Sequence, residues 1–185
     1  MKKIMLLPLL LISISLYGQG TINDSIRKTQ YGDAWWARTH GDYKKSERIL
    51  DNLIKLEPTN PKNYFEKANI HYLKKNVDSM SIYFNRALEL GMDSMKVLDE
   101  YYSYYTLQMR DNNKRIEYVD KMIKIQPSNS IFYLKRSSIW LDLHNYDDSW
   151  KDLEKAASLG NEQAKKSMEY IIETRKKLKE KGIIK

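Results

Sequence analysis

The stretch DYKKSERILDNLIKLEP, residues 42–58, decides the fold of this chain. Ser46, Leu50 and Leu53 follow one another at steps of four and three, so they share one face of a helix. Pro58 ends that helix, because a proline cannot donate the next backbone hydrogen bond. The stretch therefore predicts a short turn, an amphipathic helix and a stop.

The stop signals return along the chain at nearly constant intervals. They lie at Pro58, Gly91-Met92, Pro127 and Gly160-Asn161. The intervals are 34 residues (58 to 92), 35 residues (92 to 127) and 34 residues (127 to 161). A fixed period in this range is typical of stacked helical repeats. We therefore expect four helix pairs, each burying its apolar side by stacking on a neighbour. Their approximate bounds are 27–60, 61–94, 95–129 and 130–161.

The composition agrees with a folded, helical protein. The chain has 185 residues, a net charge of +8, 42% hydrophobic residues and 30% charged residues. It has seven glycines and four prolines, so most of it can be helical. It has no cysteine, which excludes disulfides, thiolate catalysis, zinc–thiolate sites and a lipid-anchor cysteine.

The first 20 residues have the pattern of a secretory signal peptide. Lys2 and Lys3 precede an apolar stretch, residues 4–17, that is followed by the small residues Gly18 and Gly20. The stretch is shorter than the ~20 residues that a membrane-spanning helix needs. We therefore expect residues 1–20 to be removed on export to the periplasm or outside the cell. The alternative is an uncleaved membrane anchor.

A further helix is expected after the last repeat, at residues 162–180, followed by a basic tail at 181–185. Asn161 is a suitable N-cap. The apolar residues of this segment form one narrow stripe: Ala164, Met168, Ile171, Ile172 and Leu178. One apolar stripe and a wide polar face suit a helix that caps a repeat array. The basic end, from Arg175, could contact anionic lipid or an acidic partner.

The repeats resemble tetratricopeptide repeats. The second unit carries the resemblance best, with Tyr64, Lys67-Ala68, His71, Met80, Phe84, Ala87 and Met92. The fourth shows a similar series, with Tyr133, Arg136-Ser137, Trp140, Ser149, Leu153, Ala156 and Asn161. The chain departs from the pattern at Gln30 and Asp33 in the first unit and at Arg115 in the third. The endings 87–92 and 156–164 also resemble Sel1-type repeats.

The resemblance implies an all-α fold, a right-handed α-solenoid of antiparallel helix pairs with a C-terminal capping helix. It also implies that the first helices of the pairs line a concave groove that binds a peptide or a helix. By position, the groove residues would be Tyr31, Trp35, Arg38, Phe65, Asn69, Tyr72, Glu100, Tyr104, Leu107, Leu134, Ser138 and Leu141. The alternative for each aromatic is packing between repeats, which we expect for Tyr101, Tyr102 and Tyr105. Only Asn69 matches the residues with which some family members hold a peptide's terminal carboxylate.

The sequence offers no enzyme site. His40, His71 and His144 lie far apart, and none has a second metal ligand four residues on. No phosphate-binding glycine loop or activated nucleophile can be named. We therefore expect no catalysis, cofactor or metal, and no nucleic-acid partner for an exported chain. The expected function is protein–protein binding, as an adaptor or assembly factor. The alternatives are a scaffold subunit of an envelope complex, using its convex face or basic tail, and an enzyme.

Overall fold

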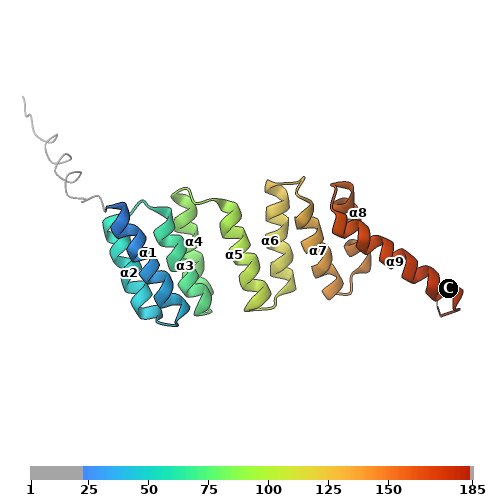
Figure 1. Ribbon diagram of the computed structural model, residues 1–185, viewed down its shortest axis with the longest axis horizontal. Helices are drawn as coiled ribbons and strands as arrows, with labels where there is room; N and C mark the ends of the chain where they lie inside the picture. The colour runs from blue at the N-terminus through green and yellow to red at the C-terminus, as the bar shows by residue number, and fades with distance from the viewer. Residues whose placement is uncertain (1–22, 184–185) are drawn as a thin grey trace, which may run out of the picture. The chain divides into compact units, whose positions relative to one another are not determined.

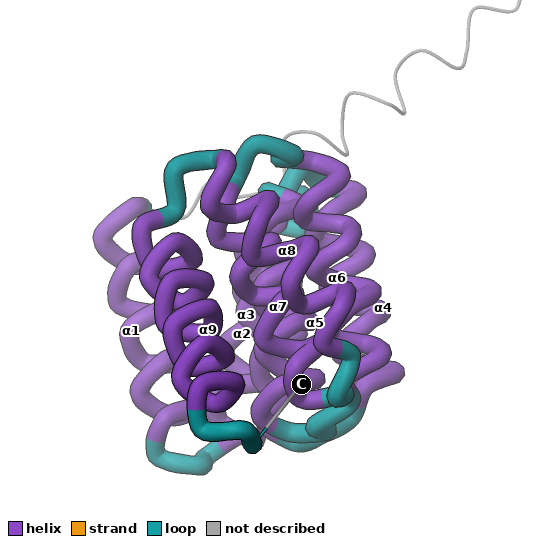
Figure 2. Tube along the Cα trace, turned by 90° about the vertical axis from the view of Figure 1, so that its right-hand side faces the viewer, coloured by secondary structure: helices purple, strands orange, loops and turns teal. Residues whose placement is uncertain are grey.

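The computed structural model describes residues 23–183, so the predicted signal peptide lies outside the described residues. Within that range the chain consists of helices joined by short turns (Figure 1, Figure 2). The helices are α1 (Asp24–Thr39), α2 (Tyr43–Leu56), α3 (Pro61–Leu73), α4 (Val77–Glu89), α5 (Ser94–Leu107), α6 (Asn112–Ile125), α7 (Ser130–Asp142), α8 (Tyr146–Ser158) and α9 (Glu162–Glu180). The predicted fold class, an all-α solenoid of helix pairs, is confirmed. No helix in the described range is both long and apolar enough to cross a bilayer.

The chain divides into two compact units. Unit 1 contains α1–α4 and unit 2 contains α5–α9. In unit 1, α1 pairs with α2, α3 pairs with α4, and α2 lies against α3. In unit 2, α5 pairs with α6, α7 pairs with α8, and α6 and α8 lie against the helices that follow them. Each pair thus buries a second face on its neighbour within the unit, as stacked repeats require.

Asparagine and aspartate side chains set the helix starts. Their side chains accept a hydrogen bond from a backbone N–H of the first turn, which satisfies a donor that has no partner within the helix. These caps are Asn23, Asp42, Asn60, Asn76, Asp111, Asn129, Asn145 and Asn161. The first helix begins at Asp24, slightly before the predicted start of the first repeat at residue 27. The reason is the cap, because Asn23 Oδ1 accepts from the N–H of Ser25 at 2.9 Å.

Glycines end two of the second helices. Gly91 has φ +92° and Gly160 has φ +86°, the left-handed conformation that costs glycine least. The helix stop predicted at Gly91 is confirmed. After each of these turns the chain continues into the next helix, α5 or α9.

The core of unit 1 forms where α2 meets α1 and α3. Leu50 and Leu53, which lie in residues 42–58, are 1% and 0% exposed. They pack with Ala34 and Ile70, and the half-buried Tyr31 covers their edge. Each fully buried apolar side chain contributes roughly 1.5–3 kcal/mol. The apolar side chains of α2 therefore pack against both α1 and α3, which joins the first helix pair to the second.

The core of unit 2 combines apolar clusters with a partly buried pair of ion pairs. Val119 and Met122 of α6 pack against Phe132 and Ile139 of α7. Arg136 of α7 reaches both neighbouring second helices. Its guanidinium donates to the two oxygens of Asp152 on α8, at 2.8 and 2.7 Å, and to Asp120 on α6 at 2.5 Å. These charge-assisted bonds fix α7 between α6 and α8.

The last helix packs only over its first turns. Ala164 is buried and Met168 packs beside it against Leu153 and Ala156. The predicted apolar stripe does not stay covered, since Ile171 is 37% and Ile172 is 56% exposed. The reason is length: α9 has 19 residues and α8 has 13, so α9 runs roughly 9 Å further at 1.5 Å per residue. Figure 1 shows α9 continuing past α8.

Candidate functional site

First helices of the pairs border one hollow in each unit. In unit 1 the hollow lies between α1 and α3, with α2 as its floor, and has a volume of about 220 Å³. We call it the α1–α3 hollow. Its lining residues are Tyr31, Gly32, Ala34, Trp35, Arg38, Ser46, Leu50, Lys62 and Glu66. The three residues predicted from the first repeat therefore come together at one place.

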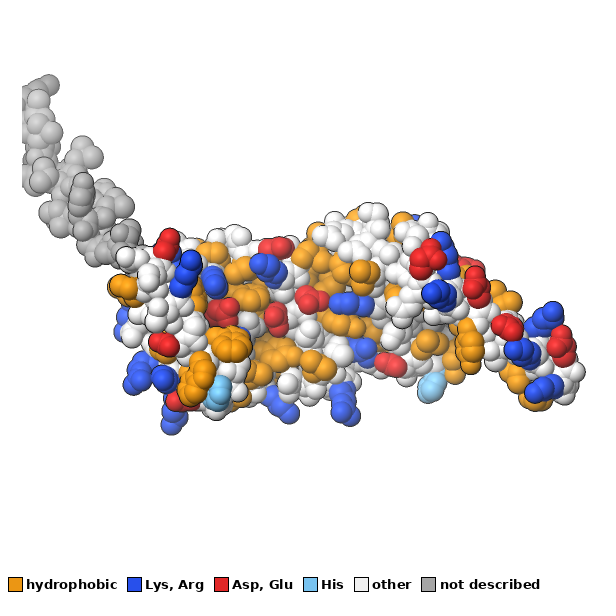
Figure 3. Space-filling view, viewed as in Figure 1, with side chains coloured by type: hydrophobic (Ala, Val, Ile, Leu, Met, Phe, Trp, Pro, Cys, Tyr) orange, Lys and Arg blue, Asp and Glu red, His pale blue; other side chains and the backbone are white. Residues whose placement is uncertain are grey.

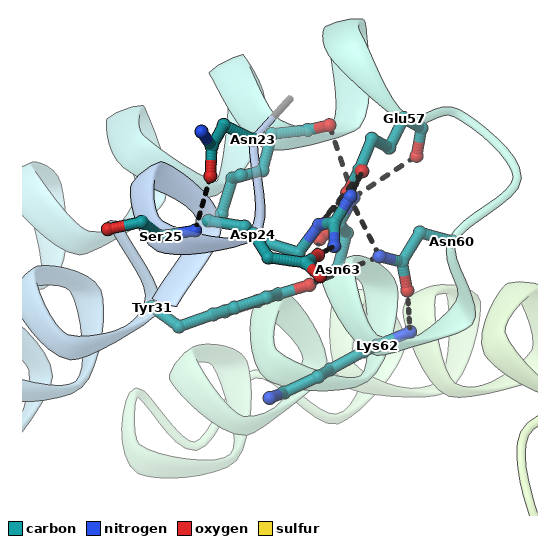
Figure 4. A network of polar contacts seen from close by, with 10 residues as sticks. Asn23, Asp24, Ser25, Tyr31, Glu57, Asn60, Lys62 and Asn63 are labelled. Atoms are coloured by element: carbon teal, nitrogen blue, oxygen red, sulfur yellow. Dashed lines mark hydrogen bonds and ion pairs between the residues drawn. The ribbon is translucent and has the colours of Figure 1, made fainter. Parts of the chain in front are cut away.

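Tyr31 is fixed at the side of this hollow by its hydroxyl group (Figure 4). The hydroxyl donates to Oδ1 of the fully buried Asn63. The amide nitrogen of Asn63 donates in turn to the backbone oxygens of Leu53 and Glu57, each at 3.1 Å. Burial raises the pKa of Tyr31 to about 12, so the hydroxyl keeps its proton near neutral pH. The ring is therefore a rigid part of the hollow.

An ion pair beside Tyr31 joins α1 to the turn that precedes α3 (Figure 4). Arg27 Nε donates to the two carboxylate oxygens of Glu57 at 2.9 and 3.1 Å. The amide of Asn60 donates to the same carboxylate at 3.0 Å. The hydrogen bond from Arg27 lowers the pKa of Glu57 below its ordinary value. This network holds the position of α1 and with it the width of the hollow.

The charges at the rim of the α1–α3 hollow are already partnered within unit 1. Arg38 Nη1 donates to Glu66 Oε2 at 3.0 Å, and the two side chains are only 18% and 26% exposed. Lys62 Nζ lies 4.1 Å from the centroid of the Tyr31 ring, a cation–π distance. Trp35 is different, because it is 58% exposed. The hollow thus offers a partner an apolar ring more than a charge.

The residues predicted from the second repeat do not line this hollow. Phe65 packs against Phe84 of α4 with ring centroids 5.5 Å apart. Asn69 and Tyr72 are partly buried. The side-chain oxygen of Asn69 is buried and has no hydrogen-bond partner among the residues that the structure describes. Their role as groove residues stays a prediction.

Unit 2 has a second hollow, between α7 and α9, with a volume of about 530 Å³. We call it the α7–α9 hollow. It contains Leu134, Ser138 and Leu141, the three residues predicted from the fourth repeat. Its other lining residues are Ser137, Leu153, Gln163, Lys166, Ser167, Tyr170 and Ile171. Its volume lies within the range of about 300–1,000 Å³ that is usual for ligand pockets.

Sequence reasoning missed Lys166 and Tyr170, because it treated α9 only as a cap. The signal that could have found them is the N-cap asparagine, because α7 and α9 begin after Asn129 and Asn161 and can be aligned on these caps. Residues three and ten positions after Asn129 are Phe132 and Ile139, and both are buried. The same steps from Asn161 give the buried Ala164 and the more exposed Ile171, so Tyr170 takes the place that Ser138 has on α7.

The residues predicted from the third repeat line neither hollow, and the prediction for Tyr104 is wrong. Tyr104 is 1% exposed and belongs to the core, with its ring edge against Tyr105 at 5.3 Å. Tyr101, at 8% exposure, is buried as expected. The two tyrosines are three residues apart and so share one side of α5. Leu107 is 68% exposed and Glu100 is partly buried.

The three histidines lie on α3 and in two turns between helices. His71 is buried, and its ring stacks on Tyr83 with centroids 5.3 Å apart. Burial lowers the pKa of His71, although Glu47 lies 3.7 Å away. His40 and His144 lie in turns between helices. Within residues 23–183 no three histidine, aspartate or glutamate side chains form a group that could hold a metal ion.

Comparison with known proteins agrees with this architecture. No family model matches the chain. The chain is similar to the TPR repeat-containing protein MJ1428 of Methanocaldococcus jannaschii, with 25% identity over 179 residues. The chain therefore resembles a tetratricopeptide-repeat protein in sequence. The match covers 91% of this chain and 30% of MJ1428, so the chain spans less than a third of that relative's length. The predicted Sel1-like features stay a prediction.

Solved structures support the fold in the same way. Two crystal structures of MamA superpose on this chain with a TM-score of 0.54 and 18% sequence identity. The superposition covers 75% of this chain and 80% or 75% of the MamA chains. At this identity the likeness concerns the fold alone. Function has to be argued from the two hollows themselves.

Proposed function

We propose that this chain is an exported adaptor or assembly factor that binds a peptide or a helix of another protein on the surface of its first helices. The observation that carries the proposal is the convergence of Tyr31, Trp35 and Arg38 on the α1–α3 hollow. Protein–protein interaction is also what the tetratricopeptide-repeat resemblance suggests. The proposal includes no catalytic step, because no nucleophile or acid–base pair has been identified.

The physical state of these side chains suits binding. An aromatic ring offers a large contact area and loses little conformational entropy when a partner covers it. Tyr31 is already held by Asn63, so it has still less freedom to lose. Trp35 supplies exposed apolar surface beside it, and exposed apolar surface of this kind marks interaction sites. Figure 3 shows apolar side chains between charges of both signs over α1 and its neighbours.

Export is proposed from residues 1–20 alone. Lys2, Lys3, the apolar stretch and the small residues before position 21 are the support for it. N-terminal sequencing of the protein recovered from cells tests this point directly. We expect a mature chain that begins near residue 19 or 21. An intact Met1 in a membrane fraction would instead identify an uncleaved anchor.

The binding proposal has a matched pair of variants. Trp35 and Trp36 are adjacent and similarly exposed, at 58% and 52%, but only Trp35 lines the α1–α3 hollow. We expect a partner captured from an envelope extract by the mature chain to bind Trp35→Ala about tenfold or more weakly. Trp36→Ala should bind nearly as well as the original chain. Circular dichroism and urea unfolding of both variants establish that they are folded.

The opposite pattern would overturn the proposal. A partner lost with Trp36→Ala and kept by Trp35→Ala would place the binding surface on the outer side of α1. A partner kept by both variants would move it to the second helices or to the basic end of α9, as a scaffold role requires.

A further inference from the structure

The two hollows differ in how their charges are compensated. In the α1–α3 hollow, Arg38 is paired with Glu66 at 3.0 Å, and Lys62 lies 4.1 Å from the centroid of the Tyr31 ring. In the α7–α9 hollow, Lys166 is the one lining residue with a Lys, Arg, Asp or Glu side chain, and it has no ion pair within the described residues. The nearest lysine in sequence, Lys165, is bound to Glu162. The α7–α9 hollow therefore has a cation without a counter-charge.

The walls around Lys166 are apolar and accessible. Leu141 is 44%, Tyr170 is 71% and Ile171 is 37% exposed. Lys166 lies four residues before Tyr170, so the two side chains are neighbours on one side of α9. Leu134 faces them from α7 across the hollow. A ligand can therefore contact an apolar wall and the ammonium group of Lys166 together.

We propose that the α7–α9 hollow binds an acidic amphipathic segment of a partner protein. Its apolar side chains lie between α7 and α9, and an Asp or Glu side chain faces Lys166. The argument is charge complementarity: a carboxylate compensates the unpaired ammonium group, whereas a basic segment adds a like charge. The inference rests on the proposed function, because it names the chemistry of the segment bound at one of the two hollows.

The rest of α9 favours the same partner. Arg175, Lys176 and Lys179 also form no ion pair with residues 23–183, whereas Lys177 is bound to Glu173. Figure 3 shows several Lys and Arg side chains, with acidic side chains between them, at the far end of α9. Their positive potential attracts an acidic segment during its approach and has a range of about 10 Å at ordinary salt.

The test uses the mature full chain and synthetic peptides. The probe is a fluorescent amphipathic helix with Leu on one face and Glu on the other, with both termini capped so that its charges belong to side chains. The matched peptides carry Gln or Lys in place of Glu. Fluorescence anisotropy should give an affinity for the Glu peptide about tenfold higher than for the Gln peptide. The Lys peptide should bind more weakly than the Gln peptide.

Variants on α9 distinguish a direct contact between a carboxylate and Lys166 from the general positive potential of the helix. Lys166→Glu should abolish the preference for the Glu peptide. Lys176→Glu makes the same charge change on the same helix, outside the hollow, and should weaken binding only about twofold. Tyr170→Ala should weaken the Glu and Gln peptides alike, by about tenfold, because it removes the apolar wall. All three side chains are exposed, so these variants should fold, which circular dichroism checks.

Several results would overturn the inference. Equal affinity for the Glu and Gln peptides would show that no carboxylate contact is made. Equal losses of affinity for the Glu peptide with Lys166→Glu and Lys176→Glu would show that the contact is not made at Lys166. Binding of phosphatidylglycerol vesicles that depends on Lys166, without peptide binding, would assign the hollow to a membrane. Self-association that Tyr170→Ala abolishes would assign it to a second copy. If these tests fail while a captured partner still depends on Trp35, the proposed function stands and only this inference falls.

Discussion

Units 1 and 2 repeat the same backbone with a different chemistry at its centre. Helices α3 and α4 reappear as α7 and α8 at residue numbers 69 higher (61–73 and 130–142, 77–89 and 146–158). Lys67 on α3 corresponds to Arg136 on α7. Lys67 contacts Asp51 of α2 and lies 4.7 Å from the Tyr83 ring of α4, whereas Arg136 binds carboxylates on both sides. The same repeat position can thus join its neighbouring helices in two ways. In unit 1 it uses one ion pair and one cation–π contact, and in unit 2 it uses two ion pairs.

The burial of the acidic partner separates the two cases. The side chain of Asp152, bound by Arg136, is 7% exposed, whereas that of Asp51 is 47% exposed. A buried carboxylate depends on its partner, because removing the partner leaves an uncompensated charge away from water. A half-exposed carboxylate is hydrated when its partner is lost. The comparison therefore teaches that the same position is essential in unit 2 and nearly optional in unit 1.

The largest expected difference comes from removing these two cations. Arg136→Ala should lower the free energy of unfolding of unit 2 by about 3–5 kcal/mol, because Asp152 is left buried and unpaired. Lys67→Ala should lower that of unit 1 by about 1 kcal/mol or less. Urea unfolding followed by circular dichroism measures both. Equal losses for the two variants would mean that burial of the carboxylate does not decide the effect.

A smaller difference concerns the contact between the helices of each pair. Ser137 and Ser149 exchange a buried hydrogen bond at 3.0 Å, where unit 1 has Ala68 and Met80. Ser137→Ala should cost about 1–3 kcal/mol, because it leaves the hydroxyl of Ser149 buried without that partner. The double variant Ser137→Ala/Ser149→Ala should unfold at a higher urea concentration than the less stable of the two single variants. A double variant with the summed loss of both single ones would contradict this account.

The smallest expected difference is a pH dependence confined to unit 1. Burial lowers the pKa of His71, so the unfolded state binds a proton more readily than the folded state. Its contribution to stability is complete above the unfolded pKa of about 6.5 and is lost as the pH falls below it. Trp140 occupies the corresponding position in unit 2 and does not titrate.

The control for this pH dependence is His71→Phe, which keeps an aromatic ring beside Tyr83. Between about pH 7.5 and pH 5.5 the urea midpoint of the original chain should fall, whereas that of the variant should change less. Carboxylates such as Glu57, whose pKa is lowered, take up protons and change the stability only in more acidic solution. A variant with the same pH profile as the original chain would exclude His71 as the cause.

Most of the fold could be predicted from the sequence, because its signals are local and repeated. Pro58 ends a helix because it has no backbone N–H, and Gly91 because it adopts a positive φ at low cost; neither property depends on neighbouring residues. The spacing of Leu50 and Leu53 identified a buried face, and both are fully covered. Two sets of predicted groove residues also come together, one in each unit, because the step from repeat to repeat is nearly constant there.

The part that failed depends on the rotation of a helix about its own axis. The turn between α5 and α6 covers residues 108–111, whereas the turns at 74–76 and 143–145 are one residue shorter. The extra residue lies after α5, but the predicted groove positions on α5 were counted as if it came before. One residue turns a helical position by about 100°, so Tyr104 was assigned to the groove and lies in the core. Tyr170 was missed for a different reason, because α9 was treated only as a cap and not as the wall of a hollow.

The central claim, that a partner binds on the first helices, is tested most directly by the tryptophan indole resonances. The chain has four tryptophans, so an NMR titration with the captured partner can resolve each indole N–H. The account predicts that the Trp35 resonance shifts or broadens on binding while that of Trp36 changes little. A change at Trp36, or at Trp150 on the second helix α8, without a change at Trp35 would contradict it.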